Sequence, residues 1–202
     1  MAEPVVRAFV AVALPAGVKG TLGRVLTSFS RALGTRDIKW VDPEGCHITL
    51  KFLGDVQQSR IPAVEEAMRR AVRSASPFAL TFDTIGVFPA REGPRVIWVG
   101  SAVESAPLNA LQQNVEGELA AVAFPADRRR FSPHITLGRV RDRAERSSLR
   151  GLEAAISEGR SLLEPPAVAH VDAAVLFQST LTPHGAIYAP LAIVPFSSRS
   201  DH

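Results

Sequence analysis

Apolar and polar residues along this 202-residue chain follow two different periods. Apolar residues spaced near 3.6 fall on one face of a helix, whereas strict alternation places them on one face of a strand. The helical spacing occurs over residues 16–33, 60–74, 106–121 and 144–158. Strand-like runs occur over residues 7–14, 78–82, 87–88, 96–99, 169–177 and 186–193. The pattern therefore predicts a protein built from both helices and strands.

One tetrapeptide, His-Ile-Thr-Leu, occurs twice, at residues 47–50 and 134–137. With five His and nine Thr in the chain, chance would give only about 0.2 His-x-Thr pairs. In a strand, the His and Thr of each copy share one face, and the Ile and Leu share the other. We therefore expect the apolar face to pack on helices and the polar face to look into a cleft.

The surroundings of the two copies also match. Phe9 lies in a strand-like run 38 residues before His47, and Ile97 lies in another 37 residues before His134. In both cases a predicted helix separates the run from the tetrapeptide, and a second predicted helix follows it. The chain therefore contains a duplicated unit of helices and strands, too long for a solenoid repeat.

This duplication predicts how the domain is organised. The two repeat units cover roughly residues 5–90 and 94–196, and no linker separates them, so we expect a single bilobal domain. The expected fold class is α+β, with two pseudo-symmetric lobes around a central cleft. Each lobe would be an antiparallel sheet with flanking helices. Residues 197–202 are typical of a disordered tail.

Composition narrows the cellular setting. Hydrophobic residues make up 46% of the chain and charged residues 21%, as in proteins that bury a core. Cys46 is the only cysteine, so one chain can form neither an internal disulfide nor a thiolate metal cluster. Signal-peptide and membrane-span patterns are lacking, and we expect a cytoplasmic monomer without a membrane partner. The net charge of +3, carried mostly by Arg, admits a polyanionic ligand.

Two imidazoles with nearby hydroxyl groups suit the chemistry of a phosphodiester. Displacement at phosphorus needs a base for the nucleophile on one side and an acid for the leaving oxygen on the other. His47 and His134 fit these roles, because the unperturbed pKa of imidazole lies near neutrality. Thr49 and Thr136 would donate hydrogen bonds to the non-bridging oxygens, and Arg139 would add a charged contact. This arrangement requires neither a metal nor another cofactor.

Other interpretations of single residues stay open at this point. One His-x-Thr pair in a strand is more often a packing feature, but packing does not require the same polar pair twice. A two-histidine zinc site would lack a clear third ligand, because Asp55 and Asp142 lie beyond the strand ends. Phe52 could stack on a base or belong to the core. The three arginines at 128–130 could attract an RNA backbone or form a solvated loop.

At these residues the chain resembles the RNA 2′,3′-cyclic phosphodiesterases, also called 2′-5′ RNA ligases, of the two-histidine phosphoesterase superfamily. The matching segments are Arg-Ala-Phe-Val-Ala-Val at 7–12, His-Ile-Thr-Leu-Lys-Phe-Leu-Gly at 47–54, Arg-Val-Ile-Trp-Val-Gly at 95–100, Phe-Ser-Pro-His-Ile-Thr-Leu-Gly-Arg at 131–139 and Tyr-Ala-Pro-Leu at 188–191. The resemblance covers nearly the whole chain. It implies hydrolysis of a terminal ribose 2′,3′-cyclic phosphate to a 2′-phosphate without a metal. It also implies catalytic roles for His47 and His134, and substrate contacts for Thr49, Thr136 and Arg139.

The expected substrate is therefore an RNA or oligonucleotide with a 2′,3′-cyclic phosphate end. Two other functions stay open, a nucleotide- or RNA-binding module with little catalysis, and ATP-independent 2′-5′ joining of RNA ends as the main activity. Intact His and Thr in both copies favour the enzyme. Arg139 follows His134, whereas Phe52 stands at the corresponding position after His47. Because a guanidinium favours neutral imidazole, we expect His134 to be the base and His47 the acid.

Overall fold

The computed structural model describes residues 3–90, 93–144, 149–182 and 185–197. Within these ranges lie the helices α1 (Ala16–Leu33), α2 (Ile61–Ala71), α3 (Ala106–Ala121) and α4 (Leu152–Ser161). The strands are β1 (Val5–Ala13), β2 (Ile38–Trp40), β3 (His47–Gln57), β4 (Phe78–Phe82), β5 (Thr84–Phe88), β6 (Val96–Gly100), β7 (Ile135–Val140), β8 (Ala167–Val171), β9 (Ala173–Thr182) and β10 (Gly185–Pro195). None of the helices in the described ranges is long and apolar enough to cross a membrane.

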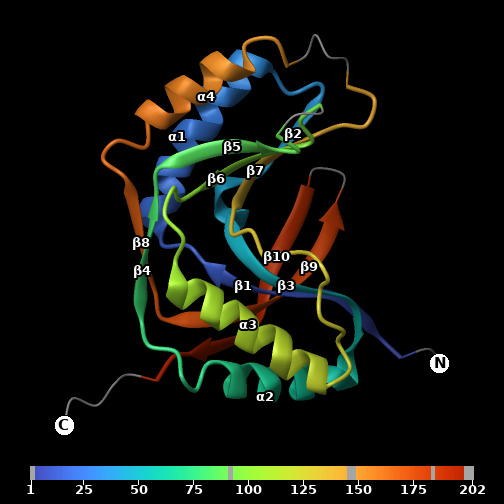
Figure 1. Cartoon of the computed structure of the whole chain (residues 1–202). Helices are drawn as coiled ribbons and strands as arrows, with labels where there is room; N and C mark the ends of the chain where they lie inside the picture. The colour runs from blue at the N-terminus through green and yellow to red at the C-terminus, as the bar shows by residue number, and fades with distance from the viewer. Residues whose placement is uncertain (1–2, 91–92, 145–148, 183–184, 198–202) are drawn as a thin grey trace.

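Most strands join one antiparallel sheet in the order β10-β9-β1-β3-β7-β6-β5, with β2 paired to β7. Its middle is narrow, because β3 and β7 pair through Ile48 and Ile135 alone. This junction separates the His47 lobe, made of β1, β3, β9 and β10, from the His134 lobe, made of β2, β5, β6 and β7. The strands β4 and β8 form a separate two-stranded sheet along one side (Figure 1).

The helices cover the lobes in two pairs. Figure 1 shows α1 and α4 side by side at the His134 lobe, and α2 and α3 side by side at the His47 lobe. Two helices cross from the lobe of the strand before them to the other lobe. The helix α1 follows β1 of the His47 lobe but contacts β2, and α3 follows β6 of the His134 lobe but contacts β3. Each lobe therefore draws elements from both expected repeat units, and the limits of those units stay a prediction.

A continuous apolar core lies between the helices and the sheet. It contains Ile48 and Ile135 from the strands together with Leu22 and Phe29 of α1 and Leu111 of α3, all nearly inaccessible to solvent. Burying a side chain of this size stabilises the fold by roughly 1.5–3 kcal/mol. The opposite face of the same strands is left for polar residues, and the expected α+β class with two lobes of antiparallel strands and flanking helices is confirmed.

The predicted elements agree with the structure where the periodicity is long and uninterrupted. The helices expected at 16–33 and 106–121 coincide with α1 and α3, whereas the one expected at 144–158 begins only at Leu152. Residues 145–148 lie outside the described residues. The continuous strand expected at 169–177 was wrong, because Asp172 separates β8 from β9 and the two belong to different sheets.

The sequence pattern did not predict one short strand, and one of its predictions falls largely outside the described residues. The strand β2 is three residues long, which is too short for a period to be recognised. Of the expected disordered tail, residues 198–202 lie outside the described residues.

Candidate active site at the junction of the lobes

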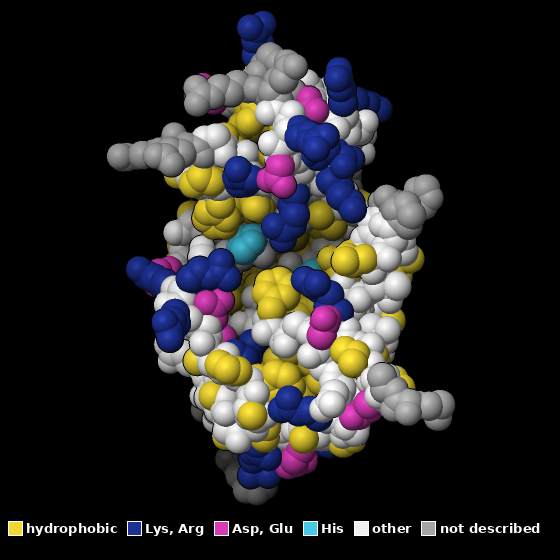
Figure 2. All heavy atoms as spheres, turned by 90° about the vertical axis from the view of Figure 1, so that its right-hand side faces the viewer, with side chains coloured by type: hydrophobic (Ala, Val, Ile, Leu, Met, Phe, Trp, Pro, Cys, Tyr) yellow, Lys and Arg dark blue, Asp and Glu magenta, His cyan; other side chains and the backbone are white. Residues whose placement is uncertain are grey.

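The two copies of the tetrapeptide meet at the middle of the sheet. His47 is the first residue of β3, and His134 directly precedes β7. The antiparallel register that pairs Ile48 with Ile135 lays the His of each copy beside the Thr of the other. Figure 2 shows histidine side chains in a hollow between the upper and lower parts of the molecule, with Lys and Arg side chains on both sides.

Each imidazole is held by the backbone in the same way. Nδ1 of His47 lies 2.7 Å from the carbonyl oxygen of Gly45, and Nδ1 of His134 lies 2.8 Å from that of Ser132. A carbonyl oxygen can only accept, so Nδ1 carries a proton and donates it in both rings. Nε2 is then the atom available for proton exchange. In His47 it lies 3.1 Å from Oγ1 of Thr49.

Aromatic rings surround His47. Its ring centroid lies 4.7 Å from that of Phe9, and Tyr188 presents its edge at 5.0 Å and 88°. Phe9 also stacks on Phe177 at 5.4 Å, and its side chain is almost completely buried. The rings come from β1, β9 and β10, so three strands together fix the plane of one imidazole.

His134 has fewer aromatic neighbours. Phe88 of β5 contacts it edge to face at 5.2 Å, and Trp98 of β6 stacks on Phe88 at 5.0 Å. The indole lies directly over Gly86, where an added Cβ would come within 2.3 Å of it, so only glycine fits there. The buried Nε1 of Trp98 has no hydrogen-bond partner among the described atoms.

Both motif strands contain a β-bulge at the same point of the tetrapeptide. The extra residues are Leu50 in β3 and Leu137 in β7, because the residues flanking each one pair with consecutive residues of the neighbouring strand. A bulge shifts the alternation of side chains by one position, and it thereby turns Phe52 and Arg139 to the face of the histidines. Phe52 is 65% exposed, with its ring 6.0 Å from that of Phe9, so the core interpretation of Phe52 is wrong.

Burial and neighbouring charges lower the pKa of both histidines. For His47, burial is the largest cause, the bond to Gly45 opposes it, and the charges of His134 and Arg139 lower the pKa further below 6.5. For His134, burial again comes first, the bond to Ser132 opposes it, and Arg139 lowers the pKa as well. Because Arg139 acts on both rings, its place after His134 does not distinguish base from acid. That assignment stays a prediction.

The remaining chemical groups near the motif are less suited to catalysis. Cys46 is buried on the helix-facing side of the sheet, and this burial raises the pKa of its thiol to about 12, so it stays protonated at neutral pH. Across the described part of the chain, no group of three or more His, Cys, Asp or Glu side chains is placed to hold a metal ion.

Sequence reasoning missed the aromatic neighbours of the two imidazoles. Tyr188 and Phe88 lie in strands far from either motif, and nothing in their local pattern points to a histidine. The one available signal for Tyr188 was its place in the Tyr-Ala-Pro-Leu segment, and for Phe9 its place in the first strand.

Comparison with known proteins agrees with this arrangement. The family described as LigT like Phosphoesterase matches the chain twice, over residues 12–98 and 99–188. The RNA 2′,3′-cyclic phosphodiesterase of Methanothermobacter thermautotrophicus is 33% identical over 189 residues, which is 93% of this chain and 97% of that protein. The protein of the same name from Thermotoga maritima is 32% identical over 191 residues, or 92% of each chain.

Solved structures share the fold. A crystal structure from Thermus thermophilus has a TM-score of 0.74 and 27% identity, and the match covers 96% of this chain and 99% of that one. A structure of E. coli LigT has a TM-score of 0.72 at 22% identity, covering 96% and 100%. Two matches of one family to the two halves, together with full-length relatives, settle the classification, and the chain belongs to the LigT-like phosphoesterases of the two-histidine phosphoesterase superfamily.

Proposed function

We propose that this protein opens the terminal 2′,3′-cyclic phosphate of RNA to a 2′-phosphate, without a metal ion. The observation that carries the proposal is the matched pair of imidazoles at the lobe junction. Each donates its Nδ1 proton to a backbone carbonyl and keeps Nε2 for the reaction. The relatives named RNA 2′,3′-cyclic phosphodiesterase support it, because they match over nearly their whole length.

The proposed reaction divides the proton transfers between the histidines. Water attacks phosphorus while the neutral imidazole accepts its proton at Nε2. The bond between phosphorus and the 3′ oxygen breaks, and the protonated imidazole gives its Nε2 proton to that oxygen. The products are a 2′-phosphate and a 3′-hydroxyl, and the base has become the protonated member of the pair. A proton exchange with solvent restores the starting state.

The other site residues bind the phosphate and the base in this proposal. Thr49 and Thr136 donate hydroxyl hydrogen bonds to the non-bridging oxygens, where negative charge concentrates in the transition state. The guanidinium of Arg139 pairs with the same charge. The exposed ring of Phe52 stacks on the terminal base. Such a contact accepts any of the bases, because every base has an aromatic face.

Because the pKa values of both histidines are lowered, the bound substrate helps to protonate one of them. With both values below 6.5, the free site is largely neutral at pH 7. The phosphodiester carries a negative charge, which raises the pKa of an adjacent imidazole. Binding of the substrate therefore favours protonation of the histidine beside the leaving oxygen.

The proposal is tested with an oligoribonucleotide that ends in a 2′,3′-cyclic phosphate, incubated with the protein in EDTA. We expect turnover to a 2′-phosphate. End treatments that are specific for a 2′- or a 3′-phosphate distinguish this product from a 3′-phosphate. Loss of turnover in EDTA with recovery on adding zinc or manganese would contradict metal independence. A 3′-phosphate product would contradict the proposed bond cleavage.

Two further arms separate the other functions. Incubation with a second RNA bearing a 5′-hydroxyl would reveal 2′-5′ joining, which is the microscopic reverse of opening the cyclic phosphate. Binding of the oligonucleotide without turnover, in the wild type and in His134→Ala alike, would indicate a binding module instead of an enzyme.

A further inference from the structure

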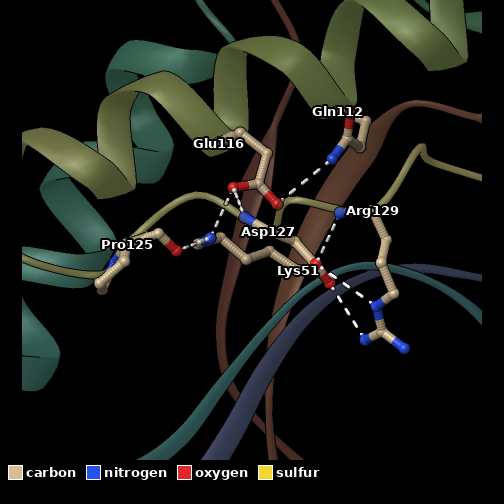
Figure 3. A network of polar contacts seen from close by, with 6 residues as sticks. All are labelled: Lys51, Gln112, Glu116, Pro125, Asp127 and Arg129. Atoms are coloured by element: carbon tan, nitrogen blue, oxygen red, sulfur yellow. Dashed lines mark hydrogen bonds and ion pairs between the residues drawn. The ribbon is translucent and has the colours of Figure 1, made fainter.

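Lys51 is the single polar or charged residue that is buried within the described ranges, with 4% of its surface exposed. It lies on the motif strand β3, directly after the bulge at Leu50, and points toward α3. Its Nζ donates to Oε2 of Glu116 at 2.6 Å and to the carbonyl oxygen of Pro125 at 2.8 Å (Figure 3). A buried ammonium needs such partners, because it has lost its hydration.

This ion pair fixes the loop at residues 125–130, which we call the arginine loop. Oε2 of Glu116 also accepts the backbone N–H of Asp127 at 3.3 Å, while Gln112 donates to Oε1 at 3.3 Å. Asp127 in turn accepts the backbone N–H of Arg129 at 3.0 Å and two hydrogen bonds from its guanidinium at 3.4 and 3.2 Å (Figure 3). The loop is thus attached at the Pro125 carbonyl and at the Asp127 amide.

The arginine loop carries three cations and ends four residues before His134. Four extended residues span at most about 14 Å, so the backbone of Arg130 lies no further than that from His134. The side chains of Arg129 and Arg130 are 86% and 87% exposed. Arg130 pairs with Glu104, a solvent-exposed pair of the kind that contributes little and that a phosphate can replace. No ion pair or hydrogen bond engages the Arg128 side chain among the described residues.

From this arrangement we propose that the arginine loop binds the sugar-phosphate backbone of the RNA strand just before its terminal nucleotide, and that Lys51 positions the loop for this contact. The inference rests on the proposed function, because it takes the terminal cyclic phosphate to lie between His47 and His134. It adds a second recognition site and a substrate preference. The protein would favour the ends of RNA strands over free nucleoside cyclic phosphates.

The preference follows from what each substrate offers. A nucleoside 2′,3′-cyclic phosphate fills the site between the lobes, whereas a strand carries further phosphates on the 5′ side of its terminal ribose. Guanidinium groups bind phosphate with two parallel hydrogen bonds, and every phosphate neutralised releases counterions. Attachment to the Lys51–Glu116 ion pair matters because a loop that is already ordered loses less conformational entropy on binding.

The test compares two substrates that share one terminal nucleotide, adenosine 2′,3′-cyclic monophosphate and a hexaribonucleotide ending in the same group. The measured quantity is the ratio of kcat/KM for the hexanucleotide to kcat/KM for the mononucleotide, at several salt concentrations. The test variant is the triple substitution Arg128→Ala, Arg129→Ala and Arg130→Ala. The control removes the same charge from α1 and from the turn after α2, on the helix-covered side, by Arg24→Ala, Arg31→Ala and Arg73→Ala.

We expect the triple loop variant to lower this ratio by about tenfold or more. The salt slope for the hexanucleotide should fall by about 0.7 for every phosphate that the loop no longer neutralises. The control triple variant should change the ratio less than about twofold, because screening weakens the effect of distant exposed charges. An unchanged ratio in the loop variant would overturn the inference. So would an equal fall in the control variant.

Lys51 is tested with both members of the ion pair replaced, by Lys51→Met together with Glu116→Leu. Replacing both partners leaves no unpaired charge, so the variant keeps its fold, which thermal unfolding checks. We expect the same ratio to fall, because the loop has lost its anchor. An unchanged ratio in the folded double variant would overturn the positioning role.

Failure of the proposed function gives a different result. A wild-type protein that turns over neither substrate contradicts the proposed function alone, since fluorescence anisotropy with the labelled hexanucleotide still reports on the loop. Binding that is weakened in the loop variant and retained in the control supports the loop. Equal binding by all three proteins overturns it.

Discussion

The His47 and His134 lobes share a backbone but not a chemical environment. Both carry the same tetrapeptide, the same Nδ1 bond to a carbonyl two residues earlier, and a bulge at the same leucine. Yet aromatic rings from three strands surround His47, while among the described residues His134 has a single ring contact, with Phe88. The comparison teaches that a repeated strand geometry places the two imidazoles, and that the positions around each strand differentiate them.

The two positions after the tetrapeptide show how this happens. The bulge directs the first of them to the core, where one lobe has Lys51 and the other has Gly138. The lysine reaches across to α3, whereas the glycine leaves room for Trp40, whose ring would lie 2.7 Å from an added Cβ. The second position faces the histidines and holds Phe52 in one lobe and Arg139 in the other. A ring and a cation thus occupy equivalent places.

The largest expected effect tests whether the histidines are equivalent. His47→Ala and His134→Ala should each lower kcat by about 10²–10⁴-fold, because each removes one proton-transfer group. A substrate with sulfur in place of the 3′ oxygen needs little protonation when that group leaves. It should therefore rescue the variant without the acid, which we expect to be His47→Ala. Rescue of His134→Ala alone would reverse the assignment, and rescue of neither would contradict acid catalysis.

The next effect concerns the buried cation, which the His134 lobe lacks. Lys51→Met should lower the free energy of unfolding by about 3 kcal/mol, because it leaves the carboxylate of Glu116, only 14% exposed, without its cation. Adding Glu116→Leu should recover most of the loss, as denaturant titration would measure. A double variant as unstable as the single one would show that the charge is not the cause.

A smaller effect is expected at the equivalent glycine. Gly138→Ala should destabilise the fold by about 1–3 kcal/mol, because the new methyl group overlaps Trp40 and Ile38. Gly117→Ala on α3 is the control, since its added Cβ meets open space and alanine favours a helix by about 0.5–1 kcal/mol. If both variants were stabilised, the close packing at Trp40 would not constrain this position.

The smallest effect is a displacement of the pH optimum. The proposed reaction needs one protonated and one neutral imidazole, so kcat/KM should fall below the lower and above the higher of the two coupled pKa values. Both values are lowered by burial and by Arg139, so we expect the optimum of kcat/KM below pH 6.5. The optimum of kcat should lie higher, because bound phosphate raises the pKa of the acid. A kcat/KM optimum above pH 7.5 would contradict the lowered values.

The lowered pKa values of the two histidines also determine how the stability of the fold changes with pH. A histidine whose pKa is lower in the folded state than its unfolded value of 6.5 binds fewer protons when folded. The contribution of the two histidines to the free energy of unfolding is therefore fully present above pH 6.5. It decreases as the pH falls from 6.5 through their folded-state pKa values.

The sequence was most informative where residues suited to catalysis occur within a regular alternation of polar and apolar positions. The repeated His and Thr, with apolar residues between them, were enough to predict two motif strands with their polar faces on one side. The bulges at Leu50 and Leu137 were not predictable, because a leucine at that point reads as an ordinary apolar position in an alternating strand. This is why Phe52 stayed undecided between core and cleft until its exposure was known.

Long-range features were less accessible for another reason. Tyr188 and Phe88 reach the histidines through strand pairing across the sheet, and no local pattern encodes which strands become neighbours. The crossing of α1 and α3 between lobes is likewise a property of the whole packing. An amphipathic helix shows that it has an apolar face, and not which sheet that face will cover.

The place of β9 between β1 and β10 has a consequence for how the protein is made. Synthesis at about 5–20 residues per second leaves β1 waiting roughly 8–36 s for residues 173–195 to emerge. Until then one edge of β1 stays open, and Phe9 lacks both Phe177 and Tyr188. A nascent chain can already hold both histidines and still lack the rings that orient one of them. The surroundings of His47 are thus completed by strands that leave the ribosome after both histidines.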